Sequence, residues 1–425
     1  MEISINRAYR ASLENLDKLV RPEIYVFHRP WPAFQVCGYI GLALAILLAT
    51  ILIIRLGLSL WVLTWILLAA VLTFFALVMI TKIITGEERI IYYHHEIAVI
   101  VVAAILLWLL RQPILPYLDV TILGIGMFLT CGRVGCFMVG CCHGRPHDWG
   151  VCYGEDHAAA GFTSYYVGVR LFPIQAVESL WALGIVIVGS ASILSGHAPG
   201  EALAWYGVTY NVGRFCFEFV RGDPERPYYW GFSQPQWISL ILMLVIVGAE
   251  LSGGLPFHMW HIGATAMMVV TMIAVSAKRR FQKIAKHRLL HPHHVKEVAE
   301  AIESASNLAT EGTAIPEWTF APTVVHVGST SLGIQISASK IRNASSCIHH
   351  YALSSQNGVM TEVTAKTLAG LILQLKYPSS NNEIIQGNHG VYHLLIHPQS
   401  GKTYSASPPT SVTPAPATAP KKPSK

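Results

Sequence analysis

Four groups of polar residues interrupt the apolar stretches of this 425-residue chain, and their types suit the binding of an anion. The first is the run Gly132-Arg133-Val134-Gly135-Cys136, which continues to Gly140-Cys141-Cys142-His143-Gly144-Arg145. Arginine is costly inside a bilayer, so Arg133 is expected to serve a ligand or a partner charge. The glycines on either side of it allow a backbone or a head group to approach closely.

The second group is Arg214, Glu218 and Arg221, spaced i, i+4 and i+7 along one face of a predicted helix. Two arginines and a glutamate on an apolar helix should point inward, towards a partner or a bound anion. Two simpler interpretations stay open: Arg214 and Glu218 form a structural ion pair, and Arg221 reaches out to the membrane surface.

The third and fourth groups open two further predicted helices. Gln175 and Glu178 follow Pro173, a residue favoured in a first helical turn. Capping of the helix entry is an alternative role for Glu178. Gln234-Pro235-Gln236 begins the next helix in the same way.

The cysteines near Arg133 suggest other chemistry. Cys131, Cys136 and Cys141 are five residues apart, which turns a helix by about 140° net, so they should not share a face. This is not zinc spacing, and we predict no metal site. A disulfide from Cys141 or Cys142 to Cys152 and a catalytic thiol at Cys141 stay open. The pairs His293-His294 and His349-His350 are predicted to be surface residues.

The composition indicates what must position these groups. The chain is 52% hydrophobic and only 13% charged, which points to a membrane protein. Windows of about 20 apolar residues are long enough to span a bilayer. We therefore predict an all-α polytopic membrane protein with seven or eight transmembrane helices, at 33–54, 59–80, 118–140, 174–194, 201–220, 236–252 and 258–277, with a marginal run at 97–110.

The remaining chain divides into three parts. Residues 1–30 form a polar N-terminal segment without a cleavable signal peptide. Residues 31–280 form the transmembrane part, and residues 281–403, with strand-like alternation such as Thr323–Val327, are predicted to be a small soluble α+β domain. Residues 404–425 are rich in Pro, Ser, Thr, Ala and Lys and are predicted to be disordered. The cluster Lys278-Arg279-Arg280 reads as a flank at a membrane surface rather than a nucleic-acid patch.

Taken together, the polar groups resemble the signature of the prolipoprotein diacylglyceryl transferase family, over about residues 31–252. The matching motifs occur in the family's order. They are Gly132-Arg133-x-Gly135 with Phe137, Gly140, Gly144 and Arg145; Pro173-x-Gln175-x-x-Glu178; Tyr206-Gly207 before Arg214-x-x-x-Glu218-x-x-Arg221; and Ser233-x-x-Gln236.

The resemblance implies an enzyme of the bacterial inner (plasma) membrane. Such enzymes move a diacylglyceryl group from phosphatidylglycerol to the lipobox cysteine thiol in the signal peptide of a preprolipoprotein, releasing glycerol phosphate. Arginines would hold the phosphate and favour the growing charge on the departing oxygen. Membrane lipids are the other expected partners, with no nucleic acid, no cofactor and no metal.

The resemblance also implies roles for individual residues. A histidine would take the proton from the incoming thiol. The catalytic candidates are Arg133, Arg214, Glu218, His94 and His95. The candidates for substrate binding are Gly132, Gly135, Gly140, Arg145, Gln175, Glu178, Tyr206, Arg221 and Gln236.

The chain departs from the family pattern at several positions. Cys136 and Val139 stand where the family has asparagines, Phe172 where it has histidine, and Cys141 where it has an acidic residue. Glu96 and Glu178 are candidates to replace that acid. Two other functions therefore stay open: a related lipid transferase with another acceptor, and a non-catalytic membrane protein that binds anionic lipid.

Membrane orientation gives two conflicting expectations. The family would place the Arg133–Arg145 edge and the N-terminus outside the cell, and eight spans would then place Lys278-Arg279-Arg280 outside as well. The positive-inside rule favours a cytoplasmic basic segment. Seven spans, with one window re-entrant or interfacial, would reconcile the two expectations, and we favour a cytoplasmic basic segment.

Overall fold

The computed structural model describes residues 13–86, 92–224, 226–281, 286–307, 311–313, 326–343, 346–377 and 380–397. Three features of the sequence analysis fall outside these ranges. They are the first twelve residues, the alternation at Thr323-Val324-Val325 and the tail 404–425.

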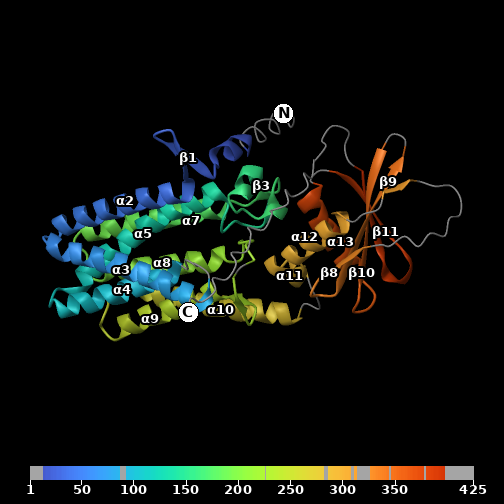
Figure 1. Ribbon diagram of the computed structural model, residues 1–425. Helices are drawn as coiled ribbons and strands as arrows, with labels where there is room; N and C mark the ends of the chain where they lie inside the picture. Colours follow the sequence, from blue (N-terminus) through green and yellow to red (C-terminus); the bar gives the residue numbers. More distant parts are fainter. Residues whose placement is uncertain are drawn as a thin grey trace, which may run out of the picture.

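The long helices of the described residues run side by side on one half of the molecule (Figure 1). They are α2 (Ala33–Arg55), α3 (Leu60–Thr85), α4 (Tyr92–Leu109), α5 (Ile114–Val139), α7 (Ile174–Leu194), α8 (Glu201–Phe217), α9 (Gln234–Leu251) and α10 (Met259–Phe281). Six of them are long and apolar enough to cross a membrane, whereas α4 and α8 are shorter. The predicted windows coincide with these helices, and the marginal window at 97–110 extends back to Tyr92.

Close packing within this bundle depends on small residues. A Cβ on Gly41 of α2 would lie 2.8 Å from Cys131 Cβ of α5, and a Cβ on Gly135 of α5 would lie 3.1 Å from Cys37 Cβ. The first turn of α8 is held by Asp119 of α5, whose carboxylate accepts hydrogen bonds from Gly200 N at 2.6 Å and Leu203 N at 2.8 Å. These contacts fix α5 between its neighbours.

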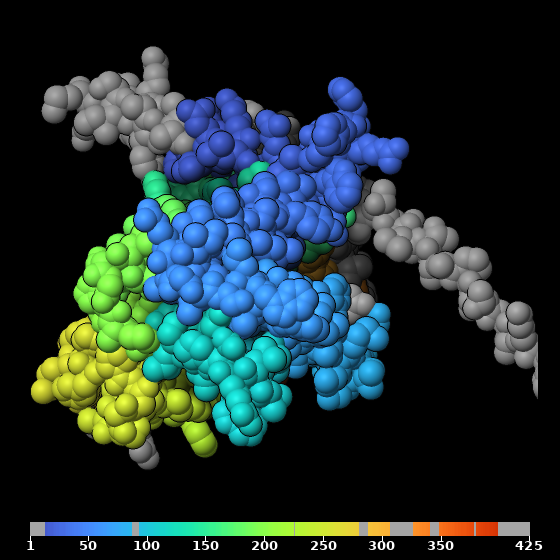
Figure 2. Space-filling model, turned by 90° about the vertical axis from the view of Figure 1, so that its left-hand side faces the viewer, coloured from blue at the N-terminus to red at the C-terminus, as the bar shows by residue number. Residues whose placement is uncertain are grey.

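Helix connections divide the bundle into two ends. The links α2–α3, α4–α5, α7–α8 and α9–α10 are short and lie together at one end, where their segments form adjacent patches (Figure 2). The opposite end carries the longer connections. These contain β3 (Pro146–Cys152), α6 (Glu155–Ala159), η1 (Ser164–Tyr166), β4 (Arg170–Leu171), and the hairpin of β5 (Tyr228–Tyr229) and β6 (Phe232–Ser233). A short hairpin of β1 (Glu23–Val26) and β2 (Arg29–Pro32) precedes α2.

Arg279, in the basic cluster after the last apolar window, lies at the same end of the bundle as Arg133. Helix α10 continues to Phe281, and Arg279 lies in its last turns. Arg279 donates a hydrogen bond to the carbonyl of Gly231, and its guanidinium lies 5.1 Å from the ring centroid of Phe232. Gly231 and Phe232 belong to the β5–β6 hairpin. This hairpin lies at the end of the bundle that carries loop 143–172, because successive described helices alternate in direction.

The region after α10 contains a six-stranded sheet in the order β11-β12-β10-β9-β7, with β8 also paired to β9. All pairs are antiparallel except β7 with β9. The strands are β7 (Glu311–Thr313), β8 (Val327–Ser329), β9 (Ile334–Asn343), β10 (Ser346–Ser355), β11 (Asn381–Gln386) and β12 (Tyr392–His397). The helical elements are α11 (Lys286–Leu289), α12 (Pro292–Asn307), α13 (Glu362–Lys376) and η2 (Asn388–Gly390).

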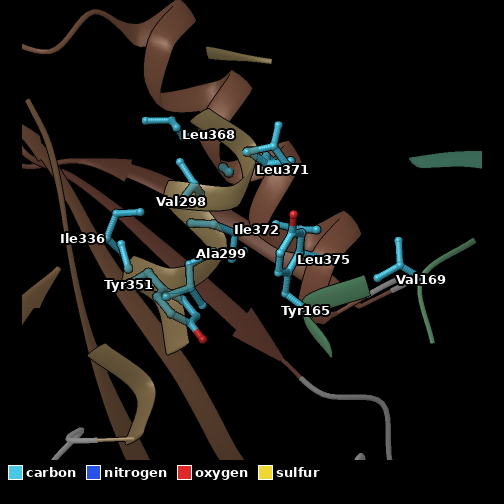
Figure 3. Close-up of a cluster of buried hydrophobic side chains, with 14 of the residues drawn as sticks. Tyr165, Val169, Val298, Ala299, Ile336, Tyr351, Leu368, Leu371, Ile372 and Leu375 are labelled. Atoms are coloured by element: carbon cyan, nitrogen blue, oxygen red, sulfur yellow. The ribbon is translucent and has the colours of Figure 1, made fainter. Parts of the chain in front are cut away.

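One apolar core joins this sheet region to the loop that follows α5. Buried residues of α12, α13 and the sheet cluster with Tyr165 and Val169 of loop 143–172 (Figure 3). Figure 3 shows Tyr165 and Val169 on the side of α13 that carries Leu375. The sheet region is therefore packed against the end of the bundle that carries the predicted site.

Candidate functional site

The carboxylate of Glu178, in the second turn of α7, joins two arginines from neighbouring helices. Its Oε1 lies 3.0 Å from Arg133 Nη2 of α5, and its Oε2 lies 3.6 Å from Arg214 Nη1 of α8. The hydroxyl of Tyr210 donates a hydrogen bond to Oε1 at 3.1 Å. All four residues are buried, so Glu178 links three helices rather than only capping its own.

Glu218, the residue directly after α8, continues this series. Its Oε1 lies 2.8 Å from Arg214 Nη2 and 3.7 Å from Arg221 Nη1. Its Oε2 pairs with Arg226 and accepts a hydrogen bond from Ser233 Oγ at 2.7 Å. The Arg214–Glu218 ion pair is therefore present, as one link of a longer series.

Asp223 completes the series beyond α8. Arg221 donates to it through Nε and Nη2, each at 2.9 Å, and Arg226 Nε lies 3.1 Å from its Oδ2. Burial alone would raise the pKa of Asp223, but Arg221 and Arg226 outweigh it and hold the pKa below its usual value. Arg221 is buried and does not reach out to a membrane surface.

We call these seven residues the arginine–carboxylate chain: Arg133, Glu178, Arg214, Glu218, Arg221, Asp223 and Arg226. Its four arginines and three carboxylates leave one positive charge in excess. Within the described residues, Arg133 Nε and Arg214 Nη1 are buried without a hydrogen-bond partner. Buried donors beside an uncompensated charge are suited to an incoming anion.

Sequence reasoning missed Asp223 and Arg226. Both lie in the polar break 221–235, which the apolar pattern marks only as a connection between helices. The available signal is the density of charge in Arg221-Gly222-Asp223-Pro224, followed by Arg226, directly after a helix that already carries buried arginine. The structure also ends α8 at Phe217, so Arg221 reaches Glu218 from the following turn and not from the helix face that the spacing predicted.

Three predicted binding residues are not members of the arginine–carboxylate chain but hold residues beside it. Gln236 caps the start of α9, where its Oε1 accepts from Ser233 N at 3.0 Å and its Nε2 donates to Phe215 O at 3.3 Å. Gln175 Nε2 donates to Cys141 O at 2.8 Å. Tyr206 stacks on Tyr210 with ring centroids 5.5 Å apart. Gln236 thus holds the serine that contacts Glu218, and Tyr206 orients the tyrosine that contacts Glu178.

Arg145 lies at the outer edge of the arginine–carboxylate chain. Its Nε donates to Arg221 O at 3.3 Å, and its backbone N donates to Val220 O at 3.0 Å. Gly144 forms a bridge with Arg221, and a Cβ on Gly144 would lie 2.4 Å from Phe172 O. Burial lowers the pKa of Arg145, and neighbouring Arg226 adds to this effect. Glycine is required at position 144 because the backbone segments of Gly144, Phe172 and Arg221 meet at that point.

The predicted catalytic histidines lie on α4. His94 is exposed, and its ring centroid lies 4.6 Å from that of Tyr93. His95 is buried, and its ring centroid lies 4.9 Å from that of Phe74. From the same helix, Glu96 hydrogen-bonds Tyr206. A base role for His94 or His95 stays a prediction.

The glycines of the Arg133 run differ in their surroundings. A Cβ on Gly132 would meet nothing within 4 Å, whereas Gly135 packs directly on α2. Gly140 ends α5 in the left-handed conformation with φ +85°, and a Cβ there would lie 2.7 Å from the ring of Phe162. Gly135 and Gly140 therefore serve packing and chain reversal, and Gly132 leaves open space beside Arg133.

Three cysteines of this run come together; Cys131 is not among them, but Cys136 and Cys141 are, although the helical spacing placed them on different faces. The Sγ atoms of Cys136, Cys141 and Cys142 lie within 4.8 Å of one another. The prediction assumed a continuous helix, but α5 ends at Val139 and the chain turns back. Cys152 is a free thiol whose Sγ lies 3.5 Å from Gly168 O, so the disulfide considered from the sequence is not formed.

Two groups beside the thiols have shifted pKa values. Hydrogen bonds from Cys136 and Cys141 lower the pKa of the Cys142 thiol, and the charges of Arg221 and Arg133 add to this. His143 is buried, which lowers its pKa, and its Nδ1 lies 2.8 Å from Gly144 O.

Buried arginines grouped at one end of a bundle of long apolar helices define the class: a multi-pass membrane protein with a candidate anion site. Residues 42–251, from α2 to the end of α9, match the family model of prolipoprotein diacylglyceryl transferase. Over these residues the chain is similar to that family.

Individual relatives agree with the family match. The chain is 29% identical over 135 residues to phosphatidylglycerol–prolipoprotein diacylglyceryl transferase 2 of Clostridium perfringens, covering 31% of this chain and 49% of the relative. It is 32% identical over 132 residues to phosphatidylglycerol–prolipoprotein diacylglyceryl transferase of Dehalococcoides mccartyi, covering 31% of this chain and 48% of the relative. The chain thus spans about half the length of the curated relatives it matches.

Proposed function

We propose that this protein transfers a diacylglyceryl group from phosphatidylglycerol to the lipobox cysteine thiol of a preprolipoprotein. The observation that carries the proposal is the meeting of Arg133, Arg214 and Arg221 on one buried chain with an excess positive charge. The arginine–carboxylate chain lies within the segment that is similar to prolipoprotein diacylglyceryl transferases. The phosphate of the lipid is the anion expected there.

The chemistry fits the surroundings. The sulfur of the acceptor forms a bond to a glyceryl carbon while the bond from that carbon to a phosphate oxygen breaks. Glycerol phosphate leaves with the electron pair, and the thiol proton passes to a base. Fixed guanidinium groups stabilise the charge that develops on the departing oxygen, and in a buried site such stabilisation is worth about 10²- to 10³-fold in rate.

The remaining features extend this proposal. All eight long helices would lie in the bacterial inner membrane, with α4 and α8 as short spans. Residues 281–403 would form a soluble domain against the site end of the bundle. Phosphatidylglycerol, the signal peptide of the acceptor and membrane lipids are the proposed partners; no nucleic acid and no cofactor enter the reaction.

Complementation tests the activity. Cells depleted of their own transferase should regain lipid-modified lipoprotein, seen by mass spectrometry, when they express this chain. The Arg214→Gln variant should lose at least about 100-fold in modification rate at equal protein level, because the phosphate loses a buried donor. Arg55→Gln, at an exposed position at the far end of α2, is the matched control and should behave as wild type.

Other outcomes decide between the rival functions. Absence of lipid modification by a well-expressed, membrane-inserted wild-type chain contradicts the proposal. Bound phosphatidylglycerol without turnover, seen by native mass spectrometry, would favour a non-catalytic lipid-binding protein. Transfer to small thiols or alcohols but not to lipoproteins would favour a transferase with another acceptor.

A further inference from the structure

Three thiols meet where α5 ends. Cys136 lies in the last turn of α5, and the chain then reverses through Gly140 at φ +85° and Cys142 at φ +53°. This reversal returns Cys141 and Cys142 to Cys136, so that the three Sγ atoms lie within 4.8 Å of one another. A left-handed conformation is unfavourable for a residue with a side chain, and such strain concentrates at functional positions.

We propose that Cys136, Cys141 and Cys142 form a binding site for a single thiophilic metal ion. Thiolates bound to Zn²⁺ lie about 2.3 Å from the metal, so tetrahedral ligands are about 3.8 Å apart. The sulfur atoms of this cluster need to move by less than about 1 Å to reach that spacing. Soft sulfur ligands select ions such as Zn²⁺ and Cu⁺ over Mg²⁺ and Ca²⁺.

Two buried arginines lie close to the cluster. Arg133 and Arg221 both lie close enough to Cys142 for their charges to act on its thiol. Three thiolates with one divalent ion carry a net charge of −1, which matches the single positive charge in excess on the arginine–carboxylate chain. Arg133 Nε is buried and lacks a hydrogen-bond partner among the described residues.

The three cysteines of the cluster differ in their exposure to solvent. Cys136 is buried, Cys142 is half-buried and Cys141 is exposed, so an ion can enter from the Cys141 side. Three protein sulfurs leave a fourth coordination position for water or an outside ligand, as in open metal sites. The site departs from the sequence prediction of no metal because that prediction rested on spacing along an unbroken helix.

Metal titration of the purified full chain tests the site. After reduction, removal of metal by a chelator and addition of Zn²⁺, the wild-type protein in detergent should bind one Zn²⁺ per chain by elemental mass spectrometry. Cd²⁺ should produce the ultraviolet thiolate-to-metal absorption band. Binding should release protons, because thiols ionise as they become ligands. Cys141→Ser, which changes an exposed side chain, should weaken binding at least about tenfold.

A matched variant and a thiol count make the outcome decisive. Cys216→Ser removes an exposed thiol outside the cluster and should bind Zn²⁺ as wild type does. Equal Zn²⁺ affinity for wild type and Cys141→Ser would overturn the site. So would failure of the fully reduced, folded chain to retain Zn²⁺, or a disulfide among these cysteines that persists under the reducing conditions. None of these readouts depends on lipid transfer.

Discussion

At the residue scale, the central feature is a set of charges that hold one another inside the bundle. Glu178 and Glu218 each contact more than one arginine, and both are almost fully buried. Removing one member of a buried pair leaves the partner charge without compensation, which costs about 3–5 kcal/mol. The carboxylates therefore maintain the fold of the site as well as its electrostatics.

The residue-scale prediction concerns Glu218. Glu218→Gln keeps the shape but removes the charge that compensates Arg214, Arg221 and Arg226, and should destabilise the folded state by about 3–5 kcal/mol. Thermal unfolding in detergent measures this as a lower Tm. Glu155→Gln changes an exposed glutamate of α6 and should leave the Tm unchanged. Equal Tm values for the two variants would contradict a structural role for the buried carboxylate.

At the scale of elements, α5 is the part of the molecule on which the site depends. It carries Arg133, packs on α2 through Gly135 and holds the start of α8 through Asp119. Its end at Gly140 directs the chain into the loop that supplies Arg145. A shift of α5 therefore moves several site residues together.

Two glycines that flank Arg133 provide a matched pair of substitutions. Gly135→Ala would place a Cβ 3.1 Å from atoms of Cys37 and Phe34, so α2 and α5 must separate slightly, and overpacking of this kind costs about 1–3 kcal/mol. Gly132→Ala meets open space and gains helix propensity, so it should be neutral or slightly stabilising.

Thermal unfolding of the two variants checks this prediction, with a lower Tm for Gly135→Ala only. Equal losses of stability would mean that both glycines serve the backbone conformation rather than packing.

At the scale of the whole molecule, the sheet region covers the end of the bundle that carries the site. Its helices share an apolar core with Tyr165 and Val169, and the His291 ring packs edge-on against Tyr228 with ring centroids 4.3 Å apart. The contact also includes His293 Nε2, which lies 3.3 Å from Arg226 O. An acceptor that approaches the arginine–carboxylate chain from this end must pass beside the sheet region.

The packing of the sheet region against the end of the bundle should weaken in mild acid. Burial, then the charges of His293 and nearby arginines, lower the pKa of His291 from 6.5 to about 4. When the sheet region is packed against the bundle, His291 is neutral. The contribution of His291 to the stability of this packing is therefore complete above pH 6.5 and is lost as the pH falls from 6.5 towards 4. Hydrogen exchange at residues 228–233, corrected for intrinsic rates, should show less protection at pH 5 than at pH 7.5.

His291→Phe is the control for this titration. It keeps an aromatic ring against Tyr228 but cannot take a proton, so its protection should change less with pH. The same pH response in wild type and in His291→Phe would assign the effect to another group.

The sequence alone determined the apolar helices and the order of the polar motifs. Helix limits follow from composition and local spacing, and the observed helices coincide with the predicted windows because burial in an apolar surrounding requires long uninterrupted apolar runs. Arg133, Arg214 and Glu218 could be selected because charge within such runs is costly.

Only the tertiary structure decided which charges meet. Glu178 joins Arg133 and Arg214 across three helices, and Arg226 reaches Glu218 from a polar connection whose spacing carries no helical signal. The thiol cluster likewise depends on the reversal at Gly140 and Cys142, which a periodicity argument treats as continuing helix. Periodicity describes positions along one element, whereas these contacts arise where elements end and pack against one another.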